Sequence, residues 1–359
     1  MGKSPLILAA LAKVANPALS ITRVTKLGQD LNHLFDSALL TDALGNNYVI
    51  KVPLTQQAAV DLDVETQVLR FFDHSVRGRL GFKLPSQMGE TRDSRGKRVV
   101  LFEYVYGAPI EVARISPSSA IATGIGIALS QIHNLPADKV RAAGLPDFTP
   151  ADVVKAQLAK LDAAAVTGLV PPALLERWQD ALENVSLFQF TPRVIHGALS
   201  EGDVLELDSE VSGILNWFGV QVSDPAMDFK WIAGAGNYEL LDAVRLGYVS
   251  NIDGVDASLT QRAILYSELS HAEWLLYGKR IGDSEIVQEA TDELNALGEL
   301  AAAGELPALT ATAFGSLADA AFVAEEPVSH EHLIENTSFI SEDATAPIEL
   351  PKPADEELF

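Results

Sequence analysis

The first hundred residues show the alternation of apolar and polar positions that is typical of β-strands. Three short runs have this pattern: residues 20–27, 33–40 and 48–52. Gly45-Asn46 supplies a hairpin signal before the last of these runs, and Pro53 closes it. We therefore expect three consecutive antiparallel strands, and the apolar run at residues 98–105 predicts another strand.

Helical periodicity dominates the rest of the chain, where apolar residues recur every three or four positions. The expected helices cover residues 55–72, 150–165, 172–185, 259–277 and 284–303. A further helix is predicted to begin with Ser116 as its N-cap and Pro117 at its first helical position. One interruption at residues 194–216 has the pattern of an embedded hairpin. Strands grouped first and helices afterwards predict the α+β fold class.

The two ends of the chain have different compositions. Lys3 precedes an apolar run, but Lys13 falls where a secretory signal stays neutral, so we expect an ordinary amphipathic helix. Its apolar positions are Leu6, Leu8, Leu11 and Val14. Residues 324–359 contain ten acidic residues, one lysine and four prolines, and this composition predicts a disordered acidic tail.

Two interpretations of the tail remain open. The first is a solubilising segment. The second is a docking segment, in which Ile348-Glu349-Leu350 or Glu357-Leu358-Phe359 binds a protein partner or the chain's own cleft.

Composition narrows the classes of function. Lys and Arg number 26 and Asp and Glu number 49, giving a formal net charge of −23. This charge argues against a general nucleic-acid surface and against adhesion to an anionic membrane. No stretch has the eighteen or more apolar residues of a membrane span. The absence of cysteine excludes disulfides, thiolate catalysis and cysteine-based zinc sites, and is compatible with the cytoplasmic location that we predict.

The segment from His196 to Leu205, with the sequence HGALSEGDVL, resembles the catalytic loop of the aminoglycoside and macrolide phosphotransferase family, which has the protein-kinase-like fold. Further segments resemble other family motifs, in the family's order. They are VIKVP at 49–53, DVE at 63–65, LFEYVYGAP at 101–109, LSQIHNLP at 129–136, GILNW at 213–217 and SDPAMDF at 223–229. Together the matches cover about residues 5 to 305.

The resemblance implies a bilobal α+β protein. Its expected parts are a β-rich N-lobe at residues 1–106, a helical C-lobe at 107–323 and the acidic tail at 324–359. ATP or GTP with Mg²⁺ would bind in the cleft between the lobes, next to an acceptor molecule. The implied nucleotide-binding residues are Lys51, its ion-pair partner Glu65, and Glu103 and Val105 of the linker. Asp228 would brace the catalytic loop, and His196 would satisfy backbone groups of that loop.

Three polar positions depart from the family pattern. Ala198 stands where the family has its catalytic aspartate, and a methyl group cannot accept a proton. Asp203 replaces the metal-binding asparagine and Asn216 replaces the second metal-binding aspartate. This reciprocal exchange still offers oxygen ligands to a hard cation. Glu201 is expected to be a solvated loop residue rather than a substitute base, and Asp224 to cap the helix that opens at Pro225.

These departures favour a catalytically impaired, pseudokinase-like member that acts by binding a nucleotide, a small molecule or a protein partner. Two alternatives remain open. One is an active or weakly active O-phosphotransferase that uses ATP or GTP on a small molecule. The other is a structural interaction protein with an empty cleft.

Overall fold

The computed structural model describes residues 3–27, 34–254 and 256–309. The chain divides into two units, Met1–Ser316 and Leu317–Phe359, and all described residues lie in the first. Residues 28–33 and the predicted acidic tail lie outside the described residues. Within the described residues, no helix combines the length and the apolar character needed to span a bilayer. The division at residues 106 and 323 stays a prediction.

A five-stranded antiparallel sheet forms the N-terminal part. Its strands are β1 (Ile21–Lys26), β2 (Phe35–Asp42), β3 (Asn47–Pro53), β4 (Gln87–Arg92) and β5 (Arg98–Glu103), in the spatial order β1-β2-β3-β5-β4. The three consecutive strands are confirmed, and Gly45 adopts a φ of 85° in the turn between β2 and β3. The sequence did not predict β4, an edge strand whose one large apolar residue, Met88, is exposed.

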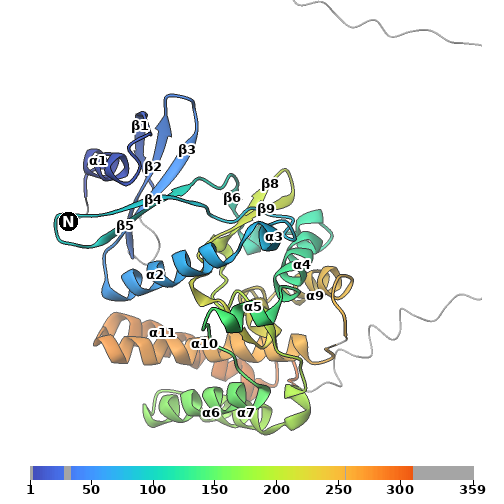
Figure 1. The fold of residues 1–359 in the computed structure, drawn as a ribbon. Coiled ribbons are helices and arrows are strands. Elements are labelled where there is room, and N and C mark those ends of the chain that lie inside the picture. The colour runs from blue at the N-terminus through green and yellow to red at the C-terminus, as the bar shows by residue number, and fades with distance from the viewer. Residues whose placement is uncertain (1–2, 28–33, 255, 310–359) are drawn as a thin grey trace, which may run out of the picture. The chain divides into compact units, whose positions relative to one another are not determined.

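Helices cover the two faces of this sheet (Figure 1). On β5, Val99 and Leu101 belong to a cluster with Leu8 of α1 (Pro5–Ala15), while Val100 and Phe102 belong to the main core with Leu62 of α2 (Gln56–Phe71). This division follows from the two-residue period of a strand. The expected N-terminal helix is present, but its buried residues are Leu8 and Ala12, and Leu6 and Val14 are exposed.

The remainder is mostly helical and confirms the α+β class. Its helices are α3 (His74–Arg77), α4 (Ala120–His133), α5 (Ala137–Ala142), α6 (Pro150–Val166), α7 (Pro172–Glu183), α8 (Lys230–Ala233), α9 (Tyr238–Val249), α10 (Leu259–Ile281) and α11 (Ser284–Ala303). α10 lies centrally in Figure 1 and contacts α6, α8 and α11.

The predicted start of α4 was wrong by three residues. The helix begins after Ser119, whose N–H donates to the Ser116 carbonyl at 3.0 Å in a preceding turn. Pro117 occupies that turn instead of the first helical position. Both positions require the same φ near −65°, so the sequence signal could not distinguish them.

Short strands connect the helical part to the segment after β5. The predicted hairpin is present as β8 (Val204–Leu207) and β9 (Glu210–Ile214), and β8 also pairs with β6 (Ala108–Pro109). β7 (Arg193–Ile195) pairs with β10 (Gln221–Ser223). The loop between β7 and β8, residues 196–203, carries the family-like motif, and these two small sheets fix its two ends.

Candidate functional site

Lys51 lies on β3 and points toward side chains from two other parts of the chain. Its Nζ donates to Asn216 Oδ1 at 2.9 Å and lies 3.4 Å from Glu65 Oε2 on α2, the expected ion pair. The rings of Phe35 and Phe102 flank the ammonium at 5.6 and 5.5 Å from their centroids. The Lys51 side chain is 18% exposed, so the cation is held in a partly desolvated position.

Asn216 continues the series of hydrogen bonds into the family-like loop. It follows β9 with a left-handed backbone (φ 60°, ψ 52°), a conformation that asparagine tolerates better than most residues. Its Nδ2 donates to Asp203 Oδ1 at 2.5 Å. Asp203 Oδ2 accepts from both the N–H and the hydroxyl of Ser200, at 2.8 and 2.7 Å. Asn216 thus links Lys51 to Asp203 through one hydrogen bond on each side.

Asp228 fixes the first two residues of the loop through hydrogen bonds to their main chain. Its carboxylate accepts from the N–H groups of His196 and Gly197, each at 2.8 Å, and lies 3.0 Å from His133 Nε2. Burial alone would raise the pKa of Asp228, but the contact with His133 and the loop N–H groups outweighs burial and lowers it. His133 Nδ1 in turn lies 2.9 Å from the Tyr248 hydroxyl. The brace implied by the resemblance therefore has a complete set of partners.

Ala198 lies where the resemblance implies a catalytic base. It is half-buried and packs closely on Gly219, since a Cβ built on Gly219 would lie 2.8 Å from the Ala198 Cβ. Glu201, three residues later, is exposed as expected, and its Oε2 accepts from the Val112 N–H at 3.0 Å. His196 is fully buried, and its Nε2 lies 2.9 Å from the Leu215 carbonyl oxygen.

Glu103 is the last residue of β5, and Val105 lies in the segment that follows this strand. The Tyr104 N–H donates to the Asn47 carbonyl at 3.0 Å. Val105 follows in irregular backbone, and its main chain makes no hydrogen bond to the main chain of the described residues. Val105 Cγ1 would lie 2.3 Å from a Cβ on Gly213, so the hairpin backbone packs directly against it.

Metal ligation was expected from Asp203 and Asn216. Within the described part of the chain, no three His, Cys, Asp or Glu side chains gather as a metal site would require. Both Asp203 oxygens and Asn216 Oδ1 already accept hydrogen bonds. As arranged here, the pair does not fit the ligand set of a tightly held Mg²⁺, which favours oxygen ligands in near-octahedral geometry.

The sequence did not predict the buried ion pair between Asp224 and Arg262. Asp224 caps the turn at Pro225 as expected, through a 2.9 Å bond from the Ala226 N–H. It also accepts two bonds from Arg262 of α10, at 2.6 and 2.9 Å, and one from the Tyr266 hydroxyl. Asp224 and Arg262 are both fully buried. Their separation of 38 residues left no local pattern that could have revealed the pair.

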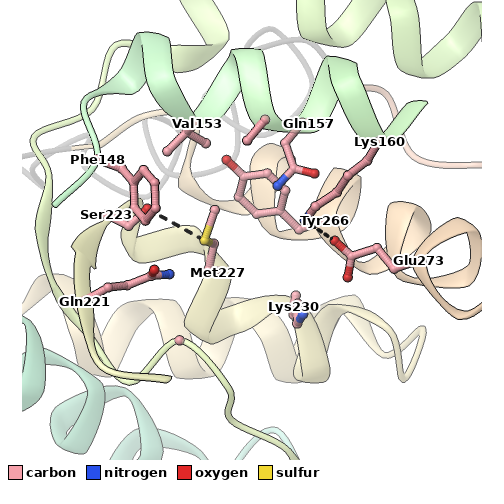
Figure 2. A pocket seen from close by; sticks show the side chains of 12 residues that line it. Phe148, Val153, Gln157, Lys160, Gln221, Ser223, Met227, Lys230, Tyr266 and Glu273 are labelled. Carbon is pink, nitrogen blue, oxygen red and sulfur yellow. Dashed lines mark hydrogen bonds and ion pairs between the residues drawn. The ribbon is translucent and has the colours of Figure 1, made fainter. Parts of the chain in front are cut away.

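A cavity of about 390 Å³ opens beside the loop; we call it the α6 cavity (Figure 2). Gln157 and Lys160 project into it from α6, Met227 and Lys230 from the segment around the start of α8, and Tyr266 and Glu273 from α10. Gly197 also lines it, so the cavity reaches the residue before Ala198.

Comparison with known proteins shows which protein family the sequence matches. Residues 32–253, more than half of the chain, match the phosphotransferase enzyme family. No curated protein sequence matches the chain.

Solved structures share the fold at low identity. Macrolide 2′-phosphotransferase MphH from Brachybacterium faecium is 19% identical, with a TM-score of 0.70 over 81% of this chain and 98% of its own. APH(2″)-IIia, solved with GDP and kanamycin, is 21% identical, with a TM-score of 0.66 over 84% and 100%. ADP-bound aminoglycoside phosphotransferase APH(2″)-Ib is 18% identical, with a TM-score of 0.59 over 80% and 96%.

Proposed function

The chain belongs to the phosphotransferase enzyme family, and from this premise we propose that it is a member with impaired phosphate transfer that acts by binding a nucleotide and a small molecule. The observation that carries this proposal is Ala198. Phosphoryl transfer needs little covalent help, but it needs a residue that orients the attacking hydroxyl and accepts its proton. The Ala198 side chain has no atom that can do either.

Among the described residues, the carboxylates on this loop and the carboxylate that braces it are all hydrogen-bonded. Asp228 is engaged with two loop N–H groups and His133, and Asp203 is engaged with Ser200 and Asn216. Glu201 is held by the Val112 N–H. Loss of a general base costs about 10²–10⁴-fold in rate. We therefore expect transfer, if measured with any acceptor, to be slow.

Nucleotide binding is supported by two features of this chain. Val105 offers an unused main-chain donor and acceptor to a base, and Lys51 offers a cation, flanked by Phe35 and Phe102, to the phosphates. A bound nucleotide would supply the phosphoryl group. Related structures contain GDP or ADP, so ATP and GTP are both candidates.

Magnesium is less well supported. The resemblance would place a metal-binding carboxylate at position 216, where this chain has the amide of Asn216, and the oxygen of that amide accepts a hydrogen bond from Lys51. No step of the proposed function depends on the ion.

Thermal unfolding with ATP and with GTP, each with and without Mg²⁺, tests the binding half of the proposal. A ligand at about 100 times its dissociation constant adds about 2.7 kcal/mol to the free energy of unfolding. Lys51→Met should abolish the increase in melting temperature, and Lys279→Met, at an exposed position on α10, should leave it unchanged. Absence of any increase with either nucleotide would favour the interaction protein with an empty cleft.

Release of ADP or GDP in the presence of kanamycin or a macrolide tests the catalytic half. The wild-type protein should show no acceptor-dependent release. Robust turnover that is indifferent to substitutions at Asp203 and Asn216 would contradict impaired catalysis and would indicate a base elsewhere.

A further inference from the structure

The lining of the α6 cavity carries a small positive charge. Its acidic side chain, Glu273, is already paired with Lys160, whose Nζ lies 2.5 Å from Glu273 Oε1. The half-buried Lys230 makes no ion pair within the described residues. Tyr266 stays neutral because burial raises its pKa well above 10. The nearby Asp224 is paired with Arg262, which also pairs with Asp256, and none of these three residues lines the cavity. One cation therefore remains without a counter-charge at the cavity wall.

Two neutral amides on the wall are available for hydrogen bonding. Gln157 is 5% exposed, and its Oε1 is buried with no hydrogen-bond partner. The side chain of Gln221 also makes no hydrogen bond to the described part of the chain, and it lies beside Gly197. A buried amide without a partner costs free energy that a bound hydroxyl or carbonyl would recover. Figure 2 shows Gln157 and Gln221 on opposite sides of the same space.

The rest of the wall is apolar. Phe148, Val153, Ala156 and Met227 provide aromatic, aliphatic and thioether surface. A volume of about 390 Å³ lies within the usual range for small-molecule sites. The cavity thus combines an apolar surface, two free amides and an unpaired lysine.

We propose that the α6 cavity binds a small anionic molecule that carries a hydroxyl group and an apolar face, such as an aromatic hydroxy acid, and that it rejects polycations. The inference rests on the proposed function, because it names the ligand class of that same site. A ligand with several ammonium groups would place like charges beside Lys230 and would meet no free carboxylate on the described wall. This would separate the chain from the relative that was solved with kanamycin, a compound with several amines.

Three compounds of nearly the same shape test the charge preference. They are 4-hydroxyphenylacetate, 4-hydroxyphenylacetamide and tyramine, which are anionic, neutral and cationic at neutral pH. Binding to the full chain is measured by calorimetry and ligand-observed NMR, with kanamycin as the polycation. We expect the anion to bind more tightly than the amide, and the amide more tightly than either cation. Tighter binding of tyramine or kanamycin, or no binding of the anion at millimolar concentration, would overturn the proposal.

Substitutions locate the binding to this cavity. Lys230→Gln should weaken the anion about tenfold and leave the neutral amide nearly unchanged, and Lys230→Glu should reverse the order of anion and cation. Gln157→Leu should weaken all three compounds, which distinguishes hydrogen bonding from charge. Lys155→Gln, on α6 but outside the cavity lining, is the matched control. Anion binding that is indifferent to both Lys230 variants would overturn the proposal.

The outcome is separable from the proposed function. Phosphate transfer to a hydroxyl of the anionic probe would contradict impaired catalysis while supporting this ligand class. Tighter binding of the cationic probes without any phosphate transfer would contradict this ligand class and would leave impaired catalysis supported.

Discussion

Lys51 and Asn216 lie 165 positions apart in sequence, and a 2.9 Å hydrogen bond joins the Lys51 ammonium to the Asn216 side-chain oxygen. This bond links β3 of the N-terminal sheet to the segment after β9. Asn216 also donates to Asp203. Asn216 is therefore hydrogen-bonded through its oxygen to Lys51 and through its nitrogen to Asp203.

Restoring the family residues should change nucleotide binding in a graded way. Ala198→Asp alone should restore little, because the oxygens at Asp203 and Asn216 remain exchanged. The triple variant Ala198→Asp, Asp203→Asn and Asn216→Asp should bind Mg²⁺-ATP or Mg²⁺-GTP more tightly than wild type, because the ion and the phosphates need charge at fixed positions. Calorimetric titration in Mg²⁺ and in EDTA measures the difference. Equal affinities for the triple variant and wild type would contradict this prediction.

Removing Arg262 should strongly destabilise the helical part. Arg262→Met leaves Asp224 buried without its cation, and breaking a buried pair in this way costs about 3–5 kcal/mol. Arg245→Ala is the control, because its pair with Asp242 is partly exposed and should contribute less than about 1 kcal/mol. Urea denaturation measures both. Similar losses for the two variants would show that burial of the Asp224 pair has no special importance.

Asp228 should make the free energy of unfolding depend on pH in the acidic range. Its pKa is lowered in the folded protein, so its contribution to the free energy of unfolding is present above the unfolded value of about 3.9 and is lost as the pH falls through the folded value. Asp228→Asn removes that contribution at pH 7. The difference in stability between wild type and the variant should therefore narrow below about pH 4. Denaturation midpoints from pH 7 to pH 3 test this, and a constant difference would refute it.

The crossing of α4 and α9 should depend on two glycines. A Cβ on Gly126 would lie 1.9 Å from the Val244 carbonyl oxygen, and one on Gly247 would lie 2.3 Å from the Thr123 carbonyl oxygen. Gly126→Ala must separate the helices, and we expect a loss of about 1–3 kcal/mol. Gly124→Ala, in the same helix, meets only Val211 Cγ2 at 3.9 Å and should stabilise by up to about 1 kcal/mol. Equal effects of the two variants would contradict the close crossing.

Periodicity along the chain predicted much of the fold, because most helices and strands bury one regular face. β4 escaped prediction because it is an edge strand with polar residues on both faces. Residues 238–249, which form α9, were not assigned to any element from the sequence, although Leu240, Leu241, Val244 and Tyr248 of this helix are buried.

Some contacts of the candidate site could also be predicted from the sequence, and others could not. Lys51 and Glu65 could be paired from the sequence through the family resemblance, which places the lysine on a strand and its partner on the helix that follows. The contact between Lys51 and Asn216, the pair of Asp224 and Arg262, and the α6 cavity depend on how distant segments pack. No local pattern encodes these relationships.

The hydrogen bond between Asp203 and Asn216 also constrains how this sequence and the family pattern can interconvert by point substitution. If Asn216→Asp comes first, two carboxylates face each other beside Glu65, with Lys51 as the neighbouring cation, and their repulsion is unfavourable unless a metal ion intervenes. If Asp203→Asn comes first, two amides face each other, and one hydrogen bond can persist without charge repulsion. We therefore expect the variant with the amide pair to be the more stable of the two intermediates.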